Sequence, residues 1–216
     1  MTCRVQIAID ASAGPASVAL FVDDVLQASR RIERQGSAEL LAPTIADVLA
    51  AAGIPARELT DVIVGGGPGS FTGLRVAAAL GKGLARGSGA RLHAVPSLPL
   101  IAAAHPDASV GTYLTVLDAL RGEWFVQAVT KHRDGSWSVD AAVERLAVAL
   151  VHDRARTHAF TIVGPPIDIV QQPDASGALR IGIVEVSRDA WEPDYGRLAE
   201  AQVQWETAHA RPLPTA

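Results

Sequence analysis

The amino-acid sequence predicts an α/β protein made of two related halves, and three features lead to this fold class. Apolar and polar residues alternate near the N-terminus, as they do in half-buried strands. An apolar, strand-like run at 61–64 leads through clustered glycines into an apolar helix, which is typical of α/β folds. The pattern of strand, aspartate, turn and strand occurs at 6–22 and again at 113–129. Domain duplication would produce this repeat, and a chance match is the alternative.

The N-terminal part predicts three strands followed by a helix. Strand-like runs lie at 5–9, 17–22 and 25–32, and two aspartates at 23–24 suit a tight turn between the last two runs. From Ser37, which can cap a helix, apolar residues recur at helical spacing until a glycine and a proline end the run. We therefore expect a meander and then a helix of about four turns.

The glycine-rich stretch 65–73, which reads GGGPGSFTG, joins the strand at 61–64 to a helix predicted for 71–86. Clustered glycines at such a junction let backbone amides approach an anion at the helix N-terminus. The stretch matches neither the dinucleotide-binding spacing nor the P-loop, because the Gly-Lys-Ser/Thr ending of the P-loop is missing. An anion site and a purely structural turn are therefore both open.

We expect two domains, at 1–105 and 106–216, because prolines at 96 and 99 interrupt the chain before the repeat begins again. The second domain opens with the strands of the repeat. After residue 130 the pattern weakens, and it predicts helices near 140–154 and 195–210 and a strand at 160–163.

The composition excludes some classes of function. The 216-residue chain has 49% hydrophobic and 19% charged residues, which is ordinary for a globular protein. A net charge of −4 argues against a broad basic surface for nucleic acid, so any RNA contact should pass through a partner. One cysteine, and no apolar run long enough for an export signal or a membrane span, predict a cytoplasmic protein that binds neither membrane nor DNA.

Five polar residues are candidates for chemistry. Asp10 and Asp118 each end a strand and could hold a metal bound to phosphates, with a loop-capping Asx turn as the alternative, which we favour for Asp118. Ser70 and Thr72 fit helix caps better than nucleophiles, because no spacing places a histidine base beside them. Arg75 could face a phosphate, the Asp10 carboxylate or solvent. The six histidines include no i,i+4 pair, so we predict no metal site and place each histidine at the surface.

Small residues recur at every fourth position along the second predicted helix, at Gly73, Ala77, Gly81 and Ala85. Each glycine lowers helix stability by roughly 1 kcal/mol relative to alanine. Close packing of another element against this small-residue ridge must offset that cost. The element packed against it is either the domain's own sheet or a helix of another subunit. From this ridge and the apolar stripe of the first helix we predict a partner interface of Leu41, Ile45, Leu49, Gly73, Ala77 and Gly81.

Five segments, in this order, resemble the TsaB family, which is also called YeaZ. They are Ile7–Asp10, Glu39–Pro43, Gly67–Arg75, Pro96–Leu98 and Asp118–Glu123. The string from Gly67 to Arg75 is the specific part of the resemblance. The remaining third of the chain matches only loosely.

The resemblance implies an actin-like ATPase fold (ASKHA, ribonuclease H-like) in two related subdomains. It also implies a subunit without catalysis of its own, which pairs through its N-terminal helices with TsaD, the enzyme that transfers threonylcarbamoyl to N6 of adenosine 37 in tRNA. The ATPase TsaE joins the pair, and tRNA is bound only through the complex. A homodimer of the isolated chain is open, and so is ATP or ADP at the subunit junction. The residues expected to face such a nucleotide or anion are Asp10, Gly67, Gly69, Ser70, Thr72 and Arg75.

The sequence departs from the TsaD pattern where a metal would bind. TsaD-like enzymes carry a His-x-x-x-His helix motif that is missing here, and Ser37-Ala38-Glu39 stands where many relatives show His-Ser-Glu. This departure favours a scaffold over an enzyme. The alternative is a stand-alone ATPase or sugar-kinase-like phosphotransferase of the same fold, but such a kinase needs a longer second domain and a second phosphate loop, and the sequence shows neither.

Overall fold

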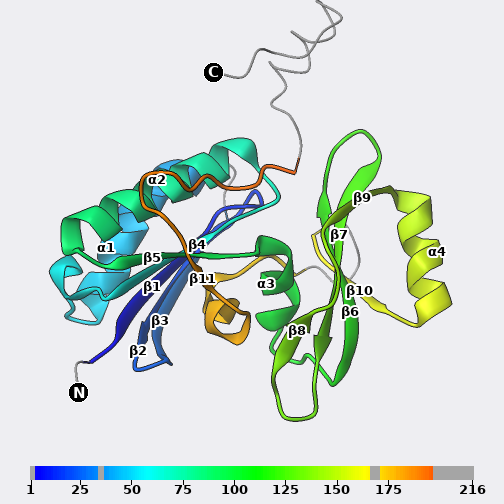
Figure 1. The fold of residues 1–216 in the computed structure, drawn as a ribbon, viewed down its shortest axis with the longest axis horizontal. Helices are drawn as coiled ribbons and strands as arrows, with labels where there is room; N and C mark the ends of the chain where they lie inside the picture. Colours follow the sequence, from blue (N-terminus) through cyan, green and yellow to red (C-terminus); the bar gives the residue numbers. More distant parts are fainter. Residues whose placement is uncertain (1–2, 34–36, 166–170, 197–216) are drawn as a thin grey trace, which may run out of the picture.

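Two β-sheets form two lobes that meet across a short helix in the computed structural model (Figure 1), which describes residues 3–33, 37–165 and 171–196. The sheet of the first lobe has the spatial order β11-β5-β4-β1-β2-β3. Its strands are β1 (Val5–Asp10), β2 (Ala16–Val22), β3 (Val25–Ile32), β4 (Asp61–Gly65), β5 (Arg91–Val95) and β11 (Val184–Glu185). The predicted N-terminal meander is confirmed, because β1, β2 and β3 are antiparallel neighbours.

The sheet of the second lobe has the order β10-β6-β7-β8, and β9 pairs with β7 as well. Its strands are β6 (Gly111–Asp118), β7 (Glu123–Lys131), β8 (Trp137–Val139), β9 (Glu144–Ala147) and β10 (Thr161–Val163). The helices are α1 (Leu41–Ala51), α2 (Phe71–Ser88), α3 (Ser97–Ala103) and α4 (Val148–His158), with 3-10 turns η1 (Ser37–Leu40), η2 (Ala56–Glu58) and η3 (Ala175–Arg180).

The two sheets repeat one arrangement. In the first lobe β4 runs parallel to β1, while β1, β2 and β3 are successively antiparallel. In the second lobe β10 runs parallel to β6, while β6, β7 and β8 are successively antiparallel. The sequence repeat corresponds to two hairpins, β1–β2 and β6–β7, and these occupy equivalent positions in the two sheets. Duplication therefore explains the repeat better than a chance match.

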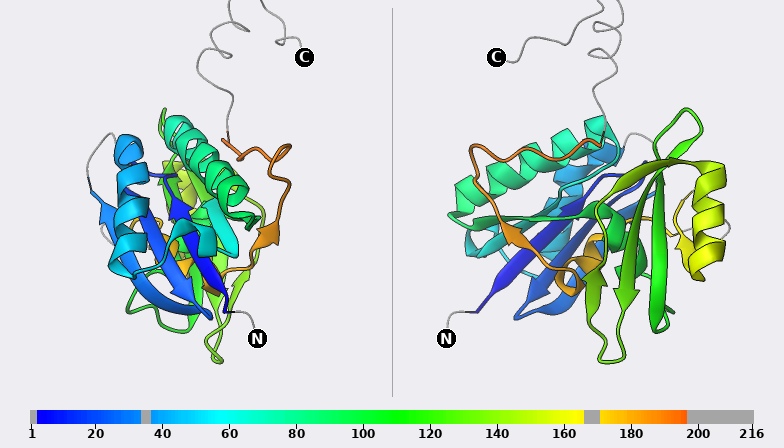
Figure 2. Two further views of the ribbon diagram at one scale, coloured as in Figure 1. Left: turned by 90° about the vertical axis from the view of Figure 1, so that its left-hand side faces the viewer. Right: turned by 45° about the vertical axis from the view of Figure 1, so that its right-hand side comes forward.

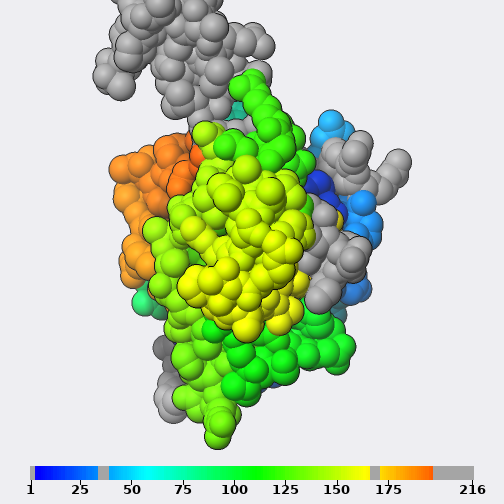
Figure 3. Space-filling view, turned by 90° about the vertical axis from the view of Figure 1, so that its right-hand side faces the viewer, coloured from blue at the N-terminus to red at the C-terminus, as the bar shows by residue number. Residues whose placement is uncertain are grey.

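Helices cover both faces of the first sheet. Helices α1 and α2 lie together on one face (Figure 2), where their apolar residues join those of β1, β2 and β4 in one core. Helix α3 and η3 cover the other face. Helix α3 also packs against β6 and β7, and all seven of its residues are buried. Helix α4 covers the outer face of the second sheet and dominates that side of the molecule (Figure 3).

Local sequence signals explain several boundaries. Asp23 and Asp24 both have positive φ, at 48° and 64°, and form the tight turn predicted between β2 and β3. Helix α2 begins after Ser70, whose hydroxyl accepts a hydrogen bond from the Gly73 amide at 3.2 Å, so the predicted cap is confirmed. Gly53, with φ of 67°, follows α1 and stops it.

Other elements were missed. We read the two prolines as interruptions, but Pro96 is the short link between β5 and α3, and Pro99 is the third residue of α3, where no intrahelical N–H is required. The segment predicted as a helix near 140–154 begins instead with β9, and α4 starts at Val148. The predicted strand at 160–163 is confirmed as β10. The predicted helix near 195–210 lies almost wholly outside the described residues.

The chain returns to the first lobe after the second sheet is complete. Turn η3 packs on β2 and α3, and β11 pairs with β5. Asp174, at the start of η3, is held by the Arg31 guanidinium at 2.6 Å. A single domain boundary at 105/106 therefore does not describe this last segment. The sequence pattern after residue 130 is too weak to show that the segment belongs to the first lobe.

The six residues predicted as a partner interface lie inside the first lobe, so this prediction is corrected. A Cβ at Gly81 would lie 2.3 Å from Cγ2 of Val64 in β4, and Ala77 has no exposed surface. The small-residue ridge of α2 therefore packs on the domain's own sheet, which was the alternative. The other four residues, Leu41, Ile45, Leu49 and Gly73, are also buried.

A second set of small residues on the same helices is exposed. We call it the outer helix face, and it consists of Ala42, Ala46 and Ala50 on α1 and Ala79, Gly83 and Gly87 on α2. A Cβ at Gly83 or Gly87 would meet no atom of residues 3–33, 37–165 or 171–196 within 4 Å. The fold of this chain therefore does not require glycine at these two places.

A buried carboxylate anchors the end of the first sheet. Asp61 has no exposed surface, and its oxygens lie 2.7 Å from Nε2 of His93, 2.8 Å from the Arg91 guanidinium and 3.2 Å from Nε of Arg4. Burial opposes ionisation, but hydrogen bonds from Thr60, His93 and Arg4 and the charge of Arg91 hold the pKa of Asp61 below its usual range. His93 is buried, so the expectation of a surface residue was wrong for this histidine.

Candidate functional site

A cleft of about 370 Å³ opens between the lobes, where the equivalent hairpin loops of the two halves approach each other. It is lined by Ser12, Ala13, Gly14, Pro15, Gly69, Ser70, Leu117, Asp118, Leu120, Phe125, Pro165 and Gln172. Arginine and lysine are absent from these lining residues, and Asp118 adds a negative charge. A polyphosphate would therefore find no charge-assisted partner among them.

Asp10 does not face the cleft. It is 1% exposed, one carboxylate oxygen accepts from the amide and hydroxyl of Ser12 at 3.0 and 2.7 Å, and the other accepts from the Ser97 hydroxyl at 2.7 Å. Burial raises the pKa of Asp10, and the hydrogen bonds from Ser97 and Ser12 oppose this rise only in part. The Ser12 bond is the Asx-type turn that the sequence left as an alternative. Asp10 therefore ties the loop after β1 to the first residue of α3, which corrects its prediction as a nucleotide-facing residue.

Four backbone amides of the glycine-rich stretch donate to acceptors of the protein itself. The Gly66 amide donates to Val95 O at 2.7 Å, and the Gly67 amide donates to Ser97 Oγ at 3.1 Å. The Ser70 amide donates to Ser12 O at 2.7 Å, and the Gly73 amide donates to Ser70 Oγ at 3.2 Å. A phosphate loop needs such amides free to point at the ligand. These contacts favour the structural turn over the anion site.

Glycine is required in this stretch because other backbone segments come too close for a side chain. A Cβ would lie 1.9 Å from the Asp194 carbonyl at Gly67, 2.1 Å from the Ser12 carbonyl at Gly69 and 2.0 Å from the Ala11 carbonyl at Gly73. Gly67 and Gly69 also have positive φ, at 93° and 155°. The most specific string of the sequence is thus a junction where three chain segments cross.

Replacing Gly69 by alanine is expected to destabilise the fold by about 1–3 kcal/mol, because the Ser12 carbonyl must move and φ is unfavourable. Urea unfolding measures this change. Gly14→Ala in the neighbouring loop is the matched control, since a Cβ there meets nothing within 4 Å, and it should change stability by about 0.5 kcal/mol or less. Equal stabilities for the two variants would contradict a structural role for Gly69.

The other predicted nucleotide-facing residues lie in three different places: two line the cleft, two are exposed on α2, and Gly67 is buried beneath Asp194. Gly69 and Ser70 line the cleft, whereas Gly67, Thr72 and Arg75 do not. Thr72 and Arg75 are exposed on the first turns of α2. The Arg75 guanidinium lies 5.3 Å from the centre of the Phe71 ring, so of the alternatives weighed for Arg75 the solvated helix face is the observed one.

Asp118 caps its own loop, as we favoured from the sequence. Its carboxylate accepts from the Leu120 amide at 2.7 Å. The following residues, Leu120 and Arg121, have positive φ of 64° and 56°, which is uncommon for residues of this size. The turn leaves Leu120 47% exposed at the lip of the cleft.

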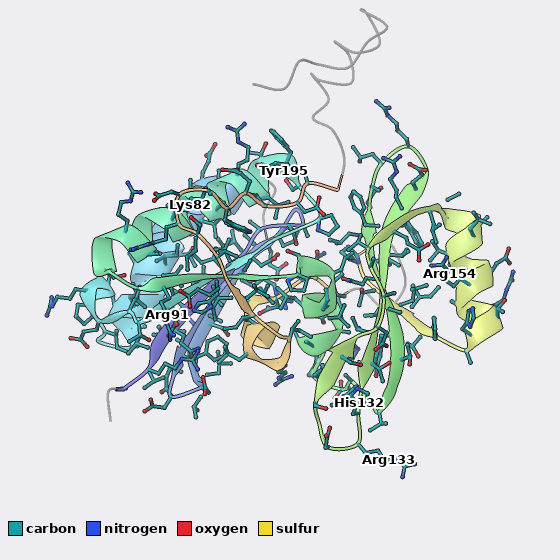
Figure 4. The ribbon with its side chains drawn as sticks, in the orientation of Figure 1. Lys82, Arg91, His132, Arg133, Arg154 and Tyr195 are labelled. Carbon is teal, nitrogen blue, oxygen red and sulfur yellow. The ribbon has the colours of Figure 1, made fainter. Side chains whose placement is uncertain are left out.

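A segment that the sequence did not single out crosses the glycine-rich stretch. We call residues 187–196 the strap. Its Asp194 amide donates to the Gly66 carbonyl at 2.8 Å, and the Tyr195 ring lies 4.6 Å from the Phe71 ring at the start of α2. Figure 4 shows Tyr195 at this end of α2 and Lys82 farther along the helix. Residues 187–194 show no helical or strand periodicity, and residues 195–196 were predicted as the start of a helix that the structure does not show there, so the sequence did not predict the position of the strap.

Two further features concern ligands and membranes. Within residues 3–33, 37–165 and 171–196, the side chains form no cluster of three or more His, Cys, Asp or Glu that could hold a metal ion. None of the helices described here is long and apolar enough to cross a lipid bilayer.

Comparison with known proteins relates both sequence and fold to one group. The family model TsaD, tRNA N6-adenosine threonylcarbamoyltransferase, matches residues 31–152, which is more than half of the chain. A protein of Escherichia coli K12 named tRNA threonylcarbamoyladenosine biosynthesis protein TsaB is 28% identical over 149 residues, covering 68% of this chain and 64% of that protein. An uncharacterised protein of Mycobacterium tuberculosis H37Rv is 32% identical over 193 residues, covering 86% of this chain and 82% of its own length.

Solved structures show the fold. A Pseudomonas aeruginosa protein described as similar to peptidase YEAZ superposes with a TM-score of 0.74 at 21% identity, over 90% of this chain and all of that chain. YeaZ from Pseudomonas aeruginosa gives a TM-score of 0.69 at 22% identity, over 81% of this chain and 89% of the other. The two-lobed actin-like ATPase fold expected from the sequence is thereby confirmed.

Proposed function

Because this chain belongs to the TsaB/YeaZ family, we propose that it serves tRNA threonylcarbamoyladenosine biosynthesis as a subunit without catalysis of its own, holding a TsaD-type transferase in its working arrangement. The transferase modifies N6 of adenosine 37, a TsaE-type ATPase joins the pair, and tRNA is reached through the complex. The match spans 64% of the Escherichia coli TsaB and 54% of the Haemophilus influenzae TsaB, so these roles are proposals for this chain.

One observation carries the scaffold part of the proposal. Gly83 lies in the interior of α2, where a glycine lowers helix stability by roughly 1 kcal/mol relative to alanine, and Gly87 lies in the last turn of the same helix. Among the residues that the structure describes, none comes within 4 Å of a Cβ at either place, whereas a Cβ at Gly81 would lie 2.3 Å from Val64. A helix of another subunit packed closely on the outer helix face would account for both glycines.

The cleft supports the non-catalytic part. Its described lining offers no cation for a phosphate, the neighbouring loop amides bond to protein acceptors, and Asp10 is held by Ser12 and Ser97. A phosphotransferase of this fold would need these groups free at the substrate. ATP or ADP at the subunit junction remains part of the proposal, with the transferase supplying the phosphate contacts.

Replacing Gly83 by leucine is expected to move stability and binding in opposite directions. The isolated chain should gain about 0.5–1 kcal/mol, because leucine is a better helix former than glycine. Affinity for the TsaD-type partner should fall about 5- to 150-fold, because overpacking typically costs about 1–3 kcal/mol. Calorimetry of the pair and threonylcarbamoyl transfer to tRNA in the full complex measure the loss.

Thr157→Leu on the exposed side of α4 is the matched control, and it should leave binding and transfer unchanged. A Gly83→Leu variant that binds and supports transfer like the parent would place the partner elsewhere. Steady ATP hydrolysis by the isolated chain would instead support the alternative, a stand-alone ATPase or sugar-kinase-like phosphotransferase.

A further inference from the structure

The strap connects the side of α2, where we propose that the partner binds, to the wall of the inter-lobe cleft. Toward its N-terminal end, Asp189 forms an ion pair with Arg86 of α2. Glu192 forms another with Lys82 of α2, with 3.0 Å between Oε1 and Nζ. At its other end, a Cβ at Gly196 would lie 2.6 Å from both the Phe125 ring and Pro68. Phe125 lines the cleft, so ten residues of chain reach from α2 to the cleft wall.

The middle of the strap holds the glycine-rich stretch from outside. The Asp194 amide donates to the Gly66 carbonyl, and the Asp194 carbonyl occupies the space that a side chain on Gly67 would need. The same stretch continues to Ser70, whose amide donates to the Ser12 carbonyl at 2.7 Å at the cleft wall. A movement of the strap therefore acts directly on backbone that shapes the cleft.

The ion pairs between the strap and α2 lie at the surface, beside one hydrogen bond from the Arg188 guanidinium to the Ala85 carbonyl at 3.2 Å. The Arg86–Asp189 pair is 73% and 79% exposed, and Glu192 is 68% exposed in its pair with Lys82. Strand β11, which precedes the strap, pairs with β5 through only two residues. Segments with few buried contacts and exposed hydrogen bonds open at low free energy. Trp191, packed at the edge of the first core, is the largest apolar anchor of the strap.

We infer that the strap is a releasable link that couples the side of α2 to the inter-lobe cleft. Removing its ion pairs with α2 frees the strap, and the freed strap loosens the Gly66–Ser70 backbone at the cleft. An acidic surface that competes for Lys82 and Arg86 would have the same effect. The functional importance of this link rests on the proposed partner of α2. The coupling itself is a property of the isolated chain.

The test is amide hydrogen exchange of the isolated chain with Lys82→Glu and Arg86→Glu combined. Exposed ion pairs contribute about 0.2–1 kcal/mol each, so exchange at the Asp194 amide should rise about 2- to 30-fold. Exchange at the Ser70 amide should rise in the same variant. The Phe160 amide, which bonds to Ala155 at the end of α4, is an internal reference and should not change.

Two further variants separate coupling from general damage. Asp189→Lys and Glu192→Lys added to the first two substitutions restore the pairs with exchanged charges and should return both amides toward parental exchange. Tyr195→Ala removes the contact with Phe71 at the other end and should reproduce the effect without touching Lys82 or Arg86.

The inference fails under two results. Unchanged exchange at Asp194 would show that the strap is not held by these pairs, and faster exchange at Asp194 with unchanged Ser70 would show that the cleft does not follow the strap. Neither result depends on a partner protein. Loss of partner binding by Gly83→Leu is a separate observation, so the proposed function and this coupling can fail independently.

Discussion

Replacing Ala77 by tryptophan should lower the melting temperature of the isolated chain by about 6–12 °C. Ala77 has no exposed surface and faces the first sheet, so an indole must displace core residues. Overpacking of this kind costs about 3 kcal/mol at the upper end of the usual range, and for this chain length each kcal/mol shifts the midpoint by about 2–4 °C. Differential scanning calorimetry measures the shift.

The same substitution two residues along the helix is the matched control. Ala79 is exposed on the outer helix face, so Ala79→Trp should change stability by about 0.5 kcal/mol or less. If the TsaD-type partner binds the outer helix face of α2, the Ala79→Trp variant should lose affinity for this partner and keep the melting temperature of the parent. Equal melting temperatures for Ala77→Trp and Ala79→Trp would contradict the assignment of the inner and outer faces of α2.

Replacing Asp61 by alanine should destabilise the first lobe by about 3 kcal/mol or more, since removal of one partner of a buried ionic cluster typically costs about 3–5 kcal/mol. The substitution leaves the buried His93 ring without its carboxylate partner and leaves Arg4 and Arg91 close together. Urea unfolding at pH 7 measures the loss. Asp153→Ala is the control, because its pair with Arg156 is exposed and should be worth about 1 kcal/mol or less.

The acid limb of the stability curve provides a second measurement on Asp61. Because folding holds its pKa below the ordinary value of 3.8, the stabilisation is present above that pH and is lost as pH falls through the folded pKa. Asp61→Asn should therefore lose less stability than the parent below about pH 4. Asp10 is present in both proteins, so its own titration cancels from the difference. Parallel acid limbs would show that Asp61 is not the group responsible.

The sequence predicted the elements whose signals are local. Alternation identified β1 to β3, the two aspartates at 23–24 identified the turn, and Ser70 identified the start of α2. Each depends on neighbouring residues and on steric rules that act within a few positions of the chain. The repeat of the β1–β2 hairpin further along the chain then led to a two-lobed fold.

The side on which a helix meets its neighbour could not be predicted. Helix α2 carries small residues at Gly73, Ala77 and Gly81 and also at Ala79 and Gly83, so spacing alone does not tell the core ridge from the exposed one. That distinction depends on Val64, which only tertiary structure places beneath Gly81. The choice between an anion site and a structural turn for the glycine-rich stretch stayed open for the same reason, because its glycines are required by carbonyls that are distant in sequence.

The return of residues 171–196 to the first lobe has a consequence for synthesis on the ribosome. The face of the first sheet opposite α1 and α2 is not fully covered until η3 (Ala175–Arg180) has left the exit tunnel, and the edge strand β5 is not paired until β11 (Val184–Glu185) has followed. Until then the face of the nascent sheet that carries Phe21 and Ile63 has α3 and the Trp137 side chain against it, without η3. The N-terminal lobe is therefore a product of nearly the whole chain, and chaperones that bind apolar surface would meet this face during translation.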